Sequence, residues 1–192
     1  MSEQKVWHSR GYLPHCDAPG LIQGITFRLH DSMPRAVLEQ WEREMEALPE
    51  TQREIERQRR IAAYLDAGHG ACWLRDARIA EVVENALLHF DGERYRVLAW
   101  VVMPNHVHVL AEMHEGWPLS KLVYSWKTWT AKRANEILAR SGTFWFREYH
   151  DRFIRDETHL ANAKAYIEEN PVKAGLCASK EEWPWGSARR ER

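Results

Sequence analysis

Cysteine is scarce in this chain, and long apolar runs are missing. The three cysteines among the 192 residues, Cys16, Cys72 and Cys177, lie far apart and form no CxxC pair. That spacing predicts neither a disulfide framework nor a zinc ribbon. No apolar stretch approaches the roughly 20 residues that cross a bilayer, and residues 1–5 lack the apolar segment of a signal peptide. We therefore expect a reducing, cytoplasmic setting and no membrane partner.

The chain also has no basic excess. Its formal net charge is −1, whereas proteins that bind nucleic acid usually carry surplus positive charge, because phosphate contacts supply much of their affinity. This balance argues mildly against a nucleic-acid partner. The charge is uneven, however: acids crowd residues 39–56, whereas residues 121–133 carry basic side chains and no acid. A local basic face is therefore compatible with the total charge.

Tryptophan, by contrast, is abundant. Ten of the 192 residues are Trp, within an otherwise ordinary composition of 44% hydrophobic and 29% charged residues. Trp suits both cores and base-stacking surfaces, and a core position is the default interpretation. The length allows one domain with its own core, or one domain plus a helical appendage, and we expect a single domain over residues 1–192.

Local patterns predict an alternation of strands and helices. After an extended arm over residues 1–20, the expected elements are a strand at 21–29, a charged helical stretch at 35–65 that Pro49 interrupts, a helix at 76–90, a hairpin of strands at 95–102 and 106–112, a helix at 118–140, a short strand at 151–155, and a helix at 157–170 that Pro171 ends. Such a split βαβ order predicts an α+β fold, an antiparallel sheet with helices on one face. Residues 35–70 then form a helical insertion after the first strand, and residues 177–192 form a loose C-terminal tail.

A histidine pair lies in the second strand of the predicted hairpin. His106 and His108 are two residues apart, so both imidazoles point to one face, while Val107 and Val109 point to the other. Two converging neutral imidazoles suit a divalent metal ion. The alternative is two histidines on a solvated strand face, which is common for an isolated HxH. The apolar flanks favour a partner for the pair, because an unpartnered buried polar group costs about 1–3 kcal/mol.

The last predicted helix carries a second polar group. Tyr166 and Asn170 are four residues apart and share a helix face with His159, beside an apolar stripe. This border between core and solvent suits a nucleophile that is held by packing with its hydroxyl exposed. The alternative is an amphipathic Tyr at the core margin, with Asn170 as a helix-end residue before Pro171.

At these residues the sequence resembles the HUH single-tyrosine transposases, in particular the REP-associated tyrosine transposases of bacteria. The resemblance covers nearly the whole chain in order. Residues 10–15 and 26–34 look like the family's opening, residues 100–110 (WVVMPNHVHVL) like its metal motif, residues 125–135 like its middle helix, and residues 151–156 with 166–176 (YIEENPVKAGL) like its nucleophile segment.

The resemblance implies a ferredoxin-like antiparallel sheet, the HUH endonuclease fold, with the His pair on a central strand. It implies that His106, His108 and Asn170 are metal ligands and that Tyr166 is the nucleophile. The metal would be Mg²⁺ or Mn²⁺. The substrates would be single-stranded DNA hairpins, the repetitive extragenic palindromes, with a short guide sequence beside the foot.

Six basic residues are candidates for DNA contact, although each is by default a solvated surface charge. They are Arg10, Lys127, Lys132, Arg133, Arg155 and Lys173. Arg10 lies in the N-terminal arm and could enter a groove, as basic arms do.

The departures from the family pattern lie away from the expected site. The acidic stretch 35–70 is longer than in the minimal transposases, which leaves both a monomer and a homodimer open. Gly186 stands where a small polar residue is expected. No second Tyr follows within a turn or two of Tyr166, so the single-tyrosine branch fits better than the replication initiators.

The function predicted from these residues is a metal-dependent endonuclease and strand transferase for hairpin DNA, working through a 5′-phosphotyrosine intermediate. Two alternatives stay open. One is a non-catalytic module of ferredoxin-like fold that binds single-stranded nucleic acid through its sheet. The other is a metal-dependent hydrolase of small phosphodiesters. Neither alternative explains the pairing of Tyr166 with Asn170.

Overall fold

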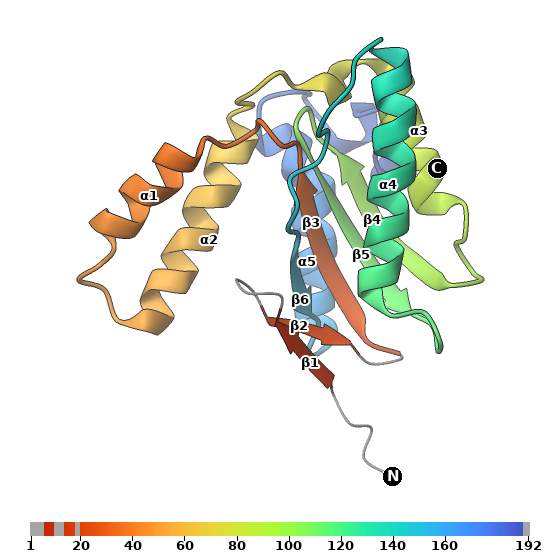
Figure 1. Ribbon diagram of the computed structural model, residues 1–192. Coiled ribbons are helices and arrows are strands. Elements are labelled where there is room, and N and C mark those ends of the chain that lie inside the picture. Colours follow the sequence, from red (N-terminus) through yellow and green to blue (C-terminus); the bar gives the residue numbers. More distant parts are fainter. Residues whose placement is uncertain (1–5, 10–13, 18–19, 190–192) are drawn as a thin grey trace.

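A four-stranded antiparallel sheet forms the centre of the computed structural model, which describes residues 6–9, 14–17 and 20–189 (Figure 1). The strand order is β4-β5-β3-β6, and the strands are β3 (Ile22–Arg28), β4 (Tyr95–Val102), β5 (His106–Met113) and β6 (His150–Phe153). β5 pairs with β3 on one side and with β4 on the other, so it is a central strand. This split βαβ arrangement is ferredoxin-like, and it confirms the predicted fold class.

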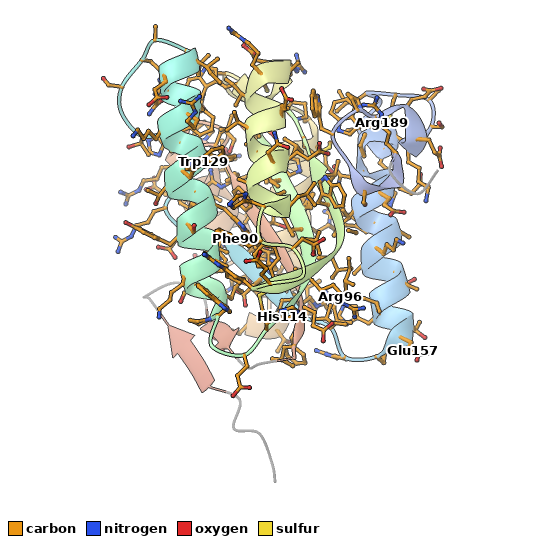
Figure 2. The ribbon with its side chains drawn as sticks, turned by 90° about the vertical axis from the view of Figure 1, so that its right-hand side faces the viewer. Phe90, Arg96, His114, Trp129, Glu157 and Arg189 are labelled. Atoms are coloured by element: carbon orange, nitrogen blue, oxygen red, sulfur yellow. The ribbon has the colours of Figure 1, made fainter. Side chains whose placement is uncertain are left out.

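Helices cover both faces of this sheet (Figures 1 and 2). Helices α3 (Ala77–Leu88) and α4 (Leu119–Ile137) share one core with Val107 and Val109, whereas α5 (Glu157–Lys173) packs through Ile167 in a second core with Leu110. The expectation of helices on one face is therefore wrong. The reason is that side chains on both faces of β4 and β5 are buried, so each face needs a cover.

The helical insertion is present where the charged stretch predicts it. Helix α1 (Arg35–Glu44) and helix α2 (Glu50–Asp66) form a hairpin that projects from the sheet (Figure 1). Pro49 precedes the first residue of α2. Arg60 of α2 forms ion pairs with Glu44 of α1 and with Glu56 of α2, which join the two helices.

The loop after α2 ties the end of the insertion to the sheet. Gly70 has φ +86, and a Cβ there would come within 2.8 Å of the Asp31 carbonyl oxygen. The backbone N–H of Ala71 donates to Asp31 Oδ2 at 2.8 Å. Asn105 Nδ2, at the turn between β4 and β5, donates to the His69 carbonyl at 2.9 Å. The last residues of α2 are therefore held beside the start of β5.

Helix α5 does not end at Pro171, which corrects the predicted boundary. Pro171 lies inside the helix, which continues to Lys173. The stop is a glycine C-cap: Gly175 has φ +68, its N–H donates to the Val172 carbonyl, and the N–H of Leu176 donates to the Pro171 carbonyl. These two bonds form a Schellman motif. Pro171 removes only one helical hydrogen bond near the helix end, so the helix tolerates it.

The residues after Leu176 are folded against β4, so the expected loose tail is also corrected for the described residues up to 189. The Val102 N–H donates to the Trp185 carbonyl at 2.8 Å, and Trp183 Nε1 donates to the Val102 carbonyl at 3.1 Å. Buried Glu168 accepts from Lys180 Nζ at 2.9 Å and from the Ser187 hydroxyl at 3.2 Å. The segment therefore covers the outer edge of β4.

The N-terminal region contains a small hairpin where an extended arm is expected. β1 (Val6–Ser9) pairs antiparallel with β2 (Pro14–Asp17), and β2 contacts β6 (Figure 1). Arg10 lies outside the described residues. Among the described helices, none has the length and apolarity needed to cross a membrane.

The close contact between Gly70 and the Asp31 carbonyl predicts that an alanine at position 70 destabilises the fold. We expect Gly70→Ala to lower the free energy of unfolding by about 2–4 kcal/mol, because it combines a left-handed backbone with a clash against the Asp31 carbonyl. Urea denaturation measures this. Gly92→Ala is the matched control, since Gly92 has φ +82 but nothing within 4 Å of its added Cβ. Equal losses for the two variants would show that the loop after α2 yields easily.

Candidate metal and nucleophile site

The two histidines of β5 meet on the sheet face that α5 covers. Their side chains are buried, with 1% of His106 and 6% of His108 exposed. Their Nε2 atoms lie 3.0 Å apart, while Val107 and Val109 point into the core on the other face. The predicted same-face pair is therefore confirmed, and its interpretation as a solvated strand face is wrong.

Hydrogen bonds at Nδ1 orient both rings. Asn105 donates through Nδ2 to the His69 carbonyl, so its Oδ1 faces His106 Nδ1, at 2.7 Å. A carbonyl oxygen can only accept, and therefore His106 carries its proton on Nδ1 and leaves Nε2 as a lone pair. His108 Nδ1 lies 2.8 Å from the Thr26 hydroxyl of β3. Such outer partners set the tautomer and direction of metal-binding imidazoles.

The hydroxyl of Thr26 allows His108 two tautomers, because a hydroxyl can donate or accept. When the hydroxyl donates to Nδ1, His108 Nε2–H can donate to His106 Nε2 across the 3.0 Å separation. When Nδ1–H donates to the hydroxyl, both Nε2 lone pairs face one point. The second state is the arrangement of two ligands around one cation.

Burial keeps both imidazoles neutral at neutral pH. It lowers the pKa of His106 well below its usual value, and the neighbouring His108 lowers it further. Burial, followed by the charge of His150, lowers the pKa of His108 to about 4. Neutral imidazole is the form that binds metal. A cation can therefore bind this pair without first displacing a proton from a charged imidazolium.

Asn170 and Tyr166 approach the pair from α5. Asn170 is fully buried, and neither polar atom of its amide has a partner of hydrogen-bond geometry among the described residues. A buried amide left in this state costs about 1–3 kcal/mol for each unmade bond, and a metal ion would satisfy its oxygen. The Tyr166 ring lies 5.5 Å from the His108 ring, between centroids, and 37% of the residue is exposed. The structure brings Tyr166 and the two histidines together, and the roles predicted for them and for Asn170 stay predictions.

Tyr166 is a weak acid in this environment. Burial, and next the negative charge of Asp66, raise the pKa of Tyr166 to about 12, while the Asn170 amide acts in the opposite direction. The phenol is therefore protonated at neutral pH. It needs a nearby positive charge or a base before it can act as a nucleophile.

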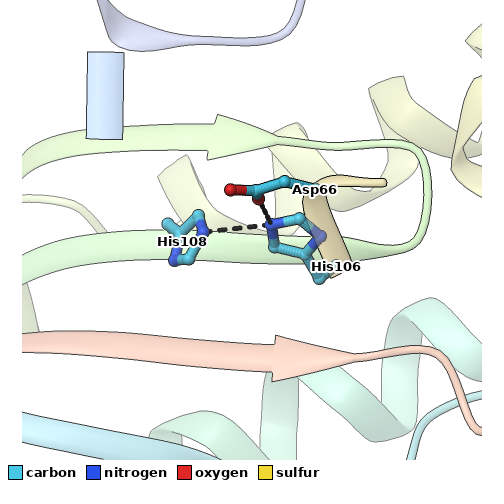
Figure 3. A group of neighbouring side chains, drawn as sticks. All are labelled: Asp66, His106 and His108. Carbon is cyan, nitrogen blue, oxygen red and sulfur yellow. Dashed lines mark hydrogen bonds and ion pairs between the residues drawn. The ribbon is translucent and has the colours of Figure 1, made fainter. Parts of the chain in front are cut away.

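Asp66, the last residue of α2, is a member of the site that the sequence did not reveal. Its Oδ1 lies 3.5 Å from His106 Nε2, and the ligand atoms of Asp66, His106 and His108 lie within 4.8 Å of one another (Figure 3). Burial raises the pKa of Asp66, while the Asn170 amide and the charge of Lys173 lower it. Asp66 and His106 are 40 residues apart, and only the fold brings them together.

Comparison with known proteins assigns this chain to a family. The sequence model described as "Transposase IS200 like" matches residues 75–170, which is half of the chain and includes both histidines, Tyr166 and Asn170. This chain belongs to the family of IS200-like transposases. The match begins after α2, so Asp66 lies outside it.

One sequence relative and one solved structure are similar to this chain. A Haemophilus influenzae protein, provisionally named a REP-associated tyrosine transposase, is 27% identical over 107 residues, which are 50% of this chain and 61% of that protein. The chain thus aligns with less than two thirds of that relative's length. A solved structure, described as a REP-associated tyrosine transposase bound to a REP hairpin, matches with a TM-score of 0.57 at 17% identity, over 95% of this chain and 83% of that one. At that identity the likeness shows a shared fold.

A cleft of about 360 Å³ adjoins the two histidines and Tyr166. His108 and Tyr166 are among its lining residues, and α5 and the strands β3 and β6 form its walls. The polar side chains along it are Thr26, His150, Arg152, His159 and Asn162. The cleft therefore offers hydrogen-bonding groups to a ligand that lies beside Tyr166.

Of the basic residues proposed for DNA contact, Lys173 lies at the site. Its Nζ is 5.3 Å from the centre of the Tyr166 ring. Arg155 is exposed just before α5, on the same side of the sheet. Lys132 and Arg133 are exposed on α4, which covers the opposite face, and Arg133 is paired with Glu136.

Lys127, also on α4, has a structural position. Its Nζ donates to the Phe146 carbonyl at 2.7 Å and to the Arg147 carbonyl at 2.6 Å. These bonds tie α4 to the segment before β6. A role of Lys127 in DNA contact stays a prediction.

Asn105 should act as a positioning residue for His106. We expect Asn105→Ala to lower the free energy of unfolding by about 1–3 kcal/mol, because it leaves the buried Nδ1–H of His106 and the part-buried carbonyl of His69 without their partner. We also expect it to weaken Mn²⁺ binding about 10–100-fold, because His106 loses the acceptor that sets its tautomer. Urea denaturation and electron paramagnetic resonance titration of free Mn²⁺ measure the two effects.

Asn135→Ala provides the matched control for this test. Asn135 Nδ2 also donates to a backbone carbonyl, that of Gly142, but lies on α4. Its removal should leave Mn²⁺ affinity unchanged. Wild-type Mn²⁺ affinity in Asn105→Ala would contradict the positioning role.

Proposed function

We propose that this chain is a metal-dependent enzyme that nicks and rejoins single-stranded hairpin DNA, of the REP-like palindromic kind, through a 5′-phosphotyrosine on Tyr166. The observation that carries the proposal is the phenol of Tyr166 beside two buried, neutral imidazoles whose Nε2 atoms lie 3.0 Å apart. The family membership supports it, and so does the fold shared with a transposase described as bound to a REP hairpin.

His106, His108 and Asn170 would hold the metal ion, Mg²⁺ or Mn²⁺. The unpartnered amide oxygen of Asn170 and the Nε2 atoms of the two histidines are the donors that fit it. When bound, such an ion polarises a phosphate and offsets charge that grows on its oxygens. Mn²⁺ should serve at least as well as Mg²⁺, because Mn²⁺ accepts nitrogen ligands more readily.

Tyr166 supplies the attacking oxygen. Its phenolate forms a bond to phosphorus as the bond to the 3′ oxygen breaks, and the phenol proton is balanced by the proton that the leaving 3′ oxygen gains. A 3′-hydroxyl that attacks the phosphotyrosine reverses these changes and rejoins a strand. No water is consumed, so the energy of the phosphodiester bond is retained.

The surroundings of Tyr166 suit a DNA strand. The cleft of about 360 Å³ beside it would receive the nucleotide next to the scissile phosphate. Lys173, whose Nζ is 5.3 Å from the Tyr166 ring, would contact that phosphate, and Arg155 would contact the strand farther along α5. For Lys132 and Arg133 to contribute, DNA would have to reach the opposite face of the sheet.

Removing the phenol oxygen tests the nucleophile. We expect Tyr166→Phe to abolish the covalent protein–DNA adduct formed with a hairpin oligonucleotide and Mn²⁺, while hairpin affinity changes less than about 3-fold, because only the attacking atom is lost. Denaturing gel electrophoresis measures the adduct, and fluorescence anisotropy measures affinity.

Tyr124→Phe is the matched control, since Tyr124 lies on α4 and is 70% exposed. It should form the adduct at the wild-type rate. An adduct that persists in Tyr166→Phe would refute the assignment. Binding without any metal-dependent adduct in the wild type would instead favour the non-catalytic binding module.

A further inference from the structure

An electrostatic conflict lies between α2 and β5. His106 carries its proton on Nδ1, where it donates to Asn105, so its Nε2 is a lone pair. That lone pair faces Asp66 Oδ1 at 3.5 Å, and Asp66 Oδ1 is buried without a hydrogen-bond partner among the described residues. Two acceptors that face each other repel unless a proton or a metal cation lies between them. A metal cation at this point would remove the repulsion and satisfy both atoms.

We propose that Asp66 is a carboxylate ligand of the metal ion held by His106 and His108, so that the α1–α2 insertion supplies part of the active centre. This inference rests on the proposed function and adds a ligand to it. The contacts from His106 to both neighbours are drawn in Figure 3.

The spacing of the three groups suits one ion. With metal–ligand bonds of about 2.1 Å, adjacent ligands of an octahedral ion lie about 3 Å apart and opposite ligands about 4 Å apart. The two separations around His106 Nε2 are 3.0 Å to His108 Nε2 and 3.5 Å to Asp66 Oδ1. All three ligand atoms lie within 4.8 Å of one another, so small side-chain rotations complete the shell.

The charge of the proposed metal site also favours Asp66 as a ligand. Two imidazoles and an amide are all neutral, whereas Mg²⁺ prefers anionic oxygen and is usually held by one or two carboxylates. Among the described residues, the group of His, Cys, Asp and Glu side chains that could hold a metal includes one carboxylate, that of Asp66. Asp66 therefore adds the charge that the other three ligands lack.

One side chain fixes Asp66 relative to His106. Asn105 donates to the His69 carbonyl, three residues after Asp66, and accepts from His106 Nδ1. The His69 ring also stacks on Tyr64 of α2 with a centroid separation of 3.9 Å. Asn105 thus links the loop after α2 to His106 of β5 through two hydrogen bonds. The family match begins at residue 75, so this ligand comes from a part of the chain outside it.

Mn²⁺ affinity of the full-length protein tests the proposal without any DNA. We expect Asp66→Asn to weaken Mn²⁺ binding at least about 10-fold, because it keeps the shape of the side chain and removes its charge. Electron paramagnetic resonance of free Mn²⁺ measures affinity, and circular dichroism confirms folding. Glu42→Gln removes an exposed carboxylate from α1 and should bind Mn²⁺ as the wild type does.

His108→Ala separates failure of this inference from failure of the proposed function. If Asp66→Asn binds Mn²⁺ normally while His108→Ala does not, the ion is at the histidines and Asp66 is not a ligand. A slower adduct with unchanged Mn²⁺ affinity in Asp66→Asn would likewise overturn the proposal and indicate a proton acceptor for Tyr166. If the wild type binds no Mn²⁺, or His108→Ala binds it normally, the metal site itself is wrong.

A direct measurement decides the matter if Asp66→Asn does not fold. Anomalous diffraction from wild-type crystals soaked in Mn²⁺ locates the ion. We expect an Asp66 carboxylate oxygen within about 2.3 Å of it, at coordination distance. An ion between the histidines with both Asp66 oxygens well beyond that distance would overturn the proposal.

Discussion

Burial of β5 on both faces is the constraint on which the rest of this structure depends. One face of the strand carries Val107 and Val109 into the core under α3 and α4, and the other carries the two histidines and Leu110. A strand of this kind cannot leave either face in water, so α5 must cover the histidine face. That cover brings Tyr166 and Asn170 to the imidazoles. It also removes water from the site and so keeps both imidazoles neutral.

The chemistry of the site follows from this desolvation. The site gathers two neutral imidazoles, the buried amide of Asn170, which has no hydrogen-bond partner among the described residues, and the partly exposed phenol of Tyr166. In water such groups would find partners in the solvent; here they can find one in a cation, which removes the cost of leaving them unsatisfied. The same burial raises the pKa of Tyr166 to about 12, so the attack that we propose for the phenol needs a positive charge or a base beside it.

The helical insertion brings Asp66 close to the histidines. Residues 35–66 form a projecting helical hairpin, and its last residue, Asp66, reaches the histidines because the following loop is pinned by Gly70 and Asn105. These contacts fix the end of the insertion relative to the two histidines. Asn105 is central to that coupling, since it bonds both the loop after α2 and the ring of His106.

Local patterns in the sequence were sufficient for the main elements of the fold and for four residues of the site. The period of two in β5 placed His106 and His108 on one face, and the four-residue spacing of Tyr166 and Asn170 placed them on one helix face, because such spacings are properties of the backbone alone. The motif resemblance joined the two pairs into one site. The insertion, with its break at Pro49, was also visible in the charged pattern.

Other features depend on contacts between distant segments, and only the tertiary structure decided them. The helix cover on both faces, the continuation of α5 through Pro171 to the cap at Gly175, and the docking of residues 177–189 on β4 all required knowledge of what lies next to each element. Asp66 is the clearest case. Nothing in its helical neighbours distinguishes it from the other acids of the insertion, and its place near His106 comes from a loop geometry set by Asp31, Gly70 and Asn105. Spacing along one element is encoded locally, whereas proximity between elements results from packing.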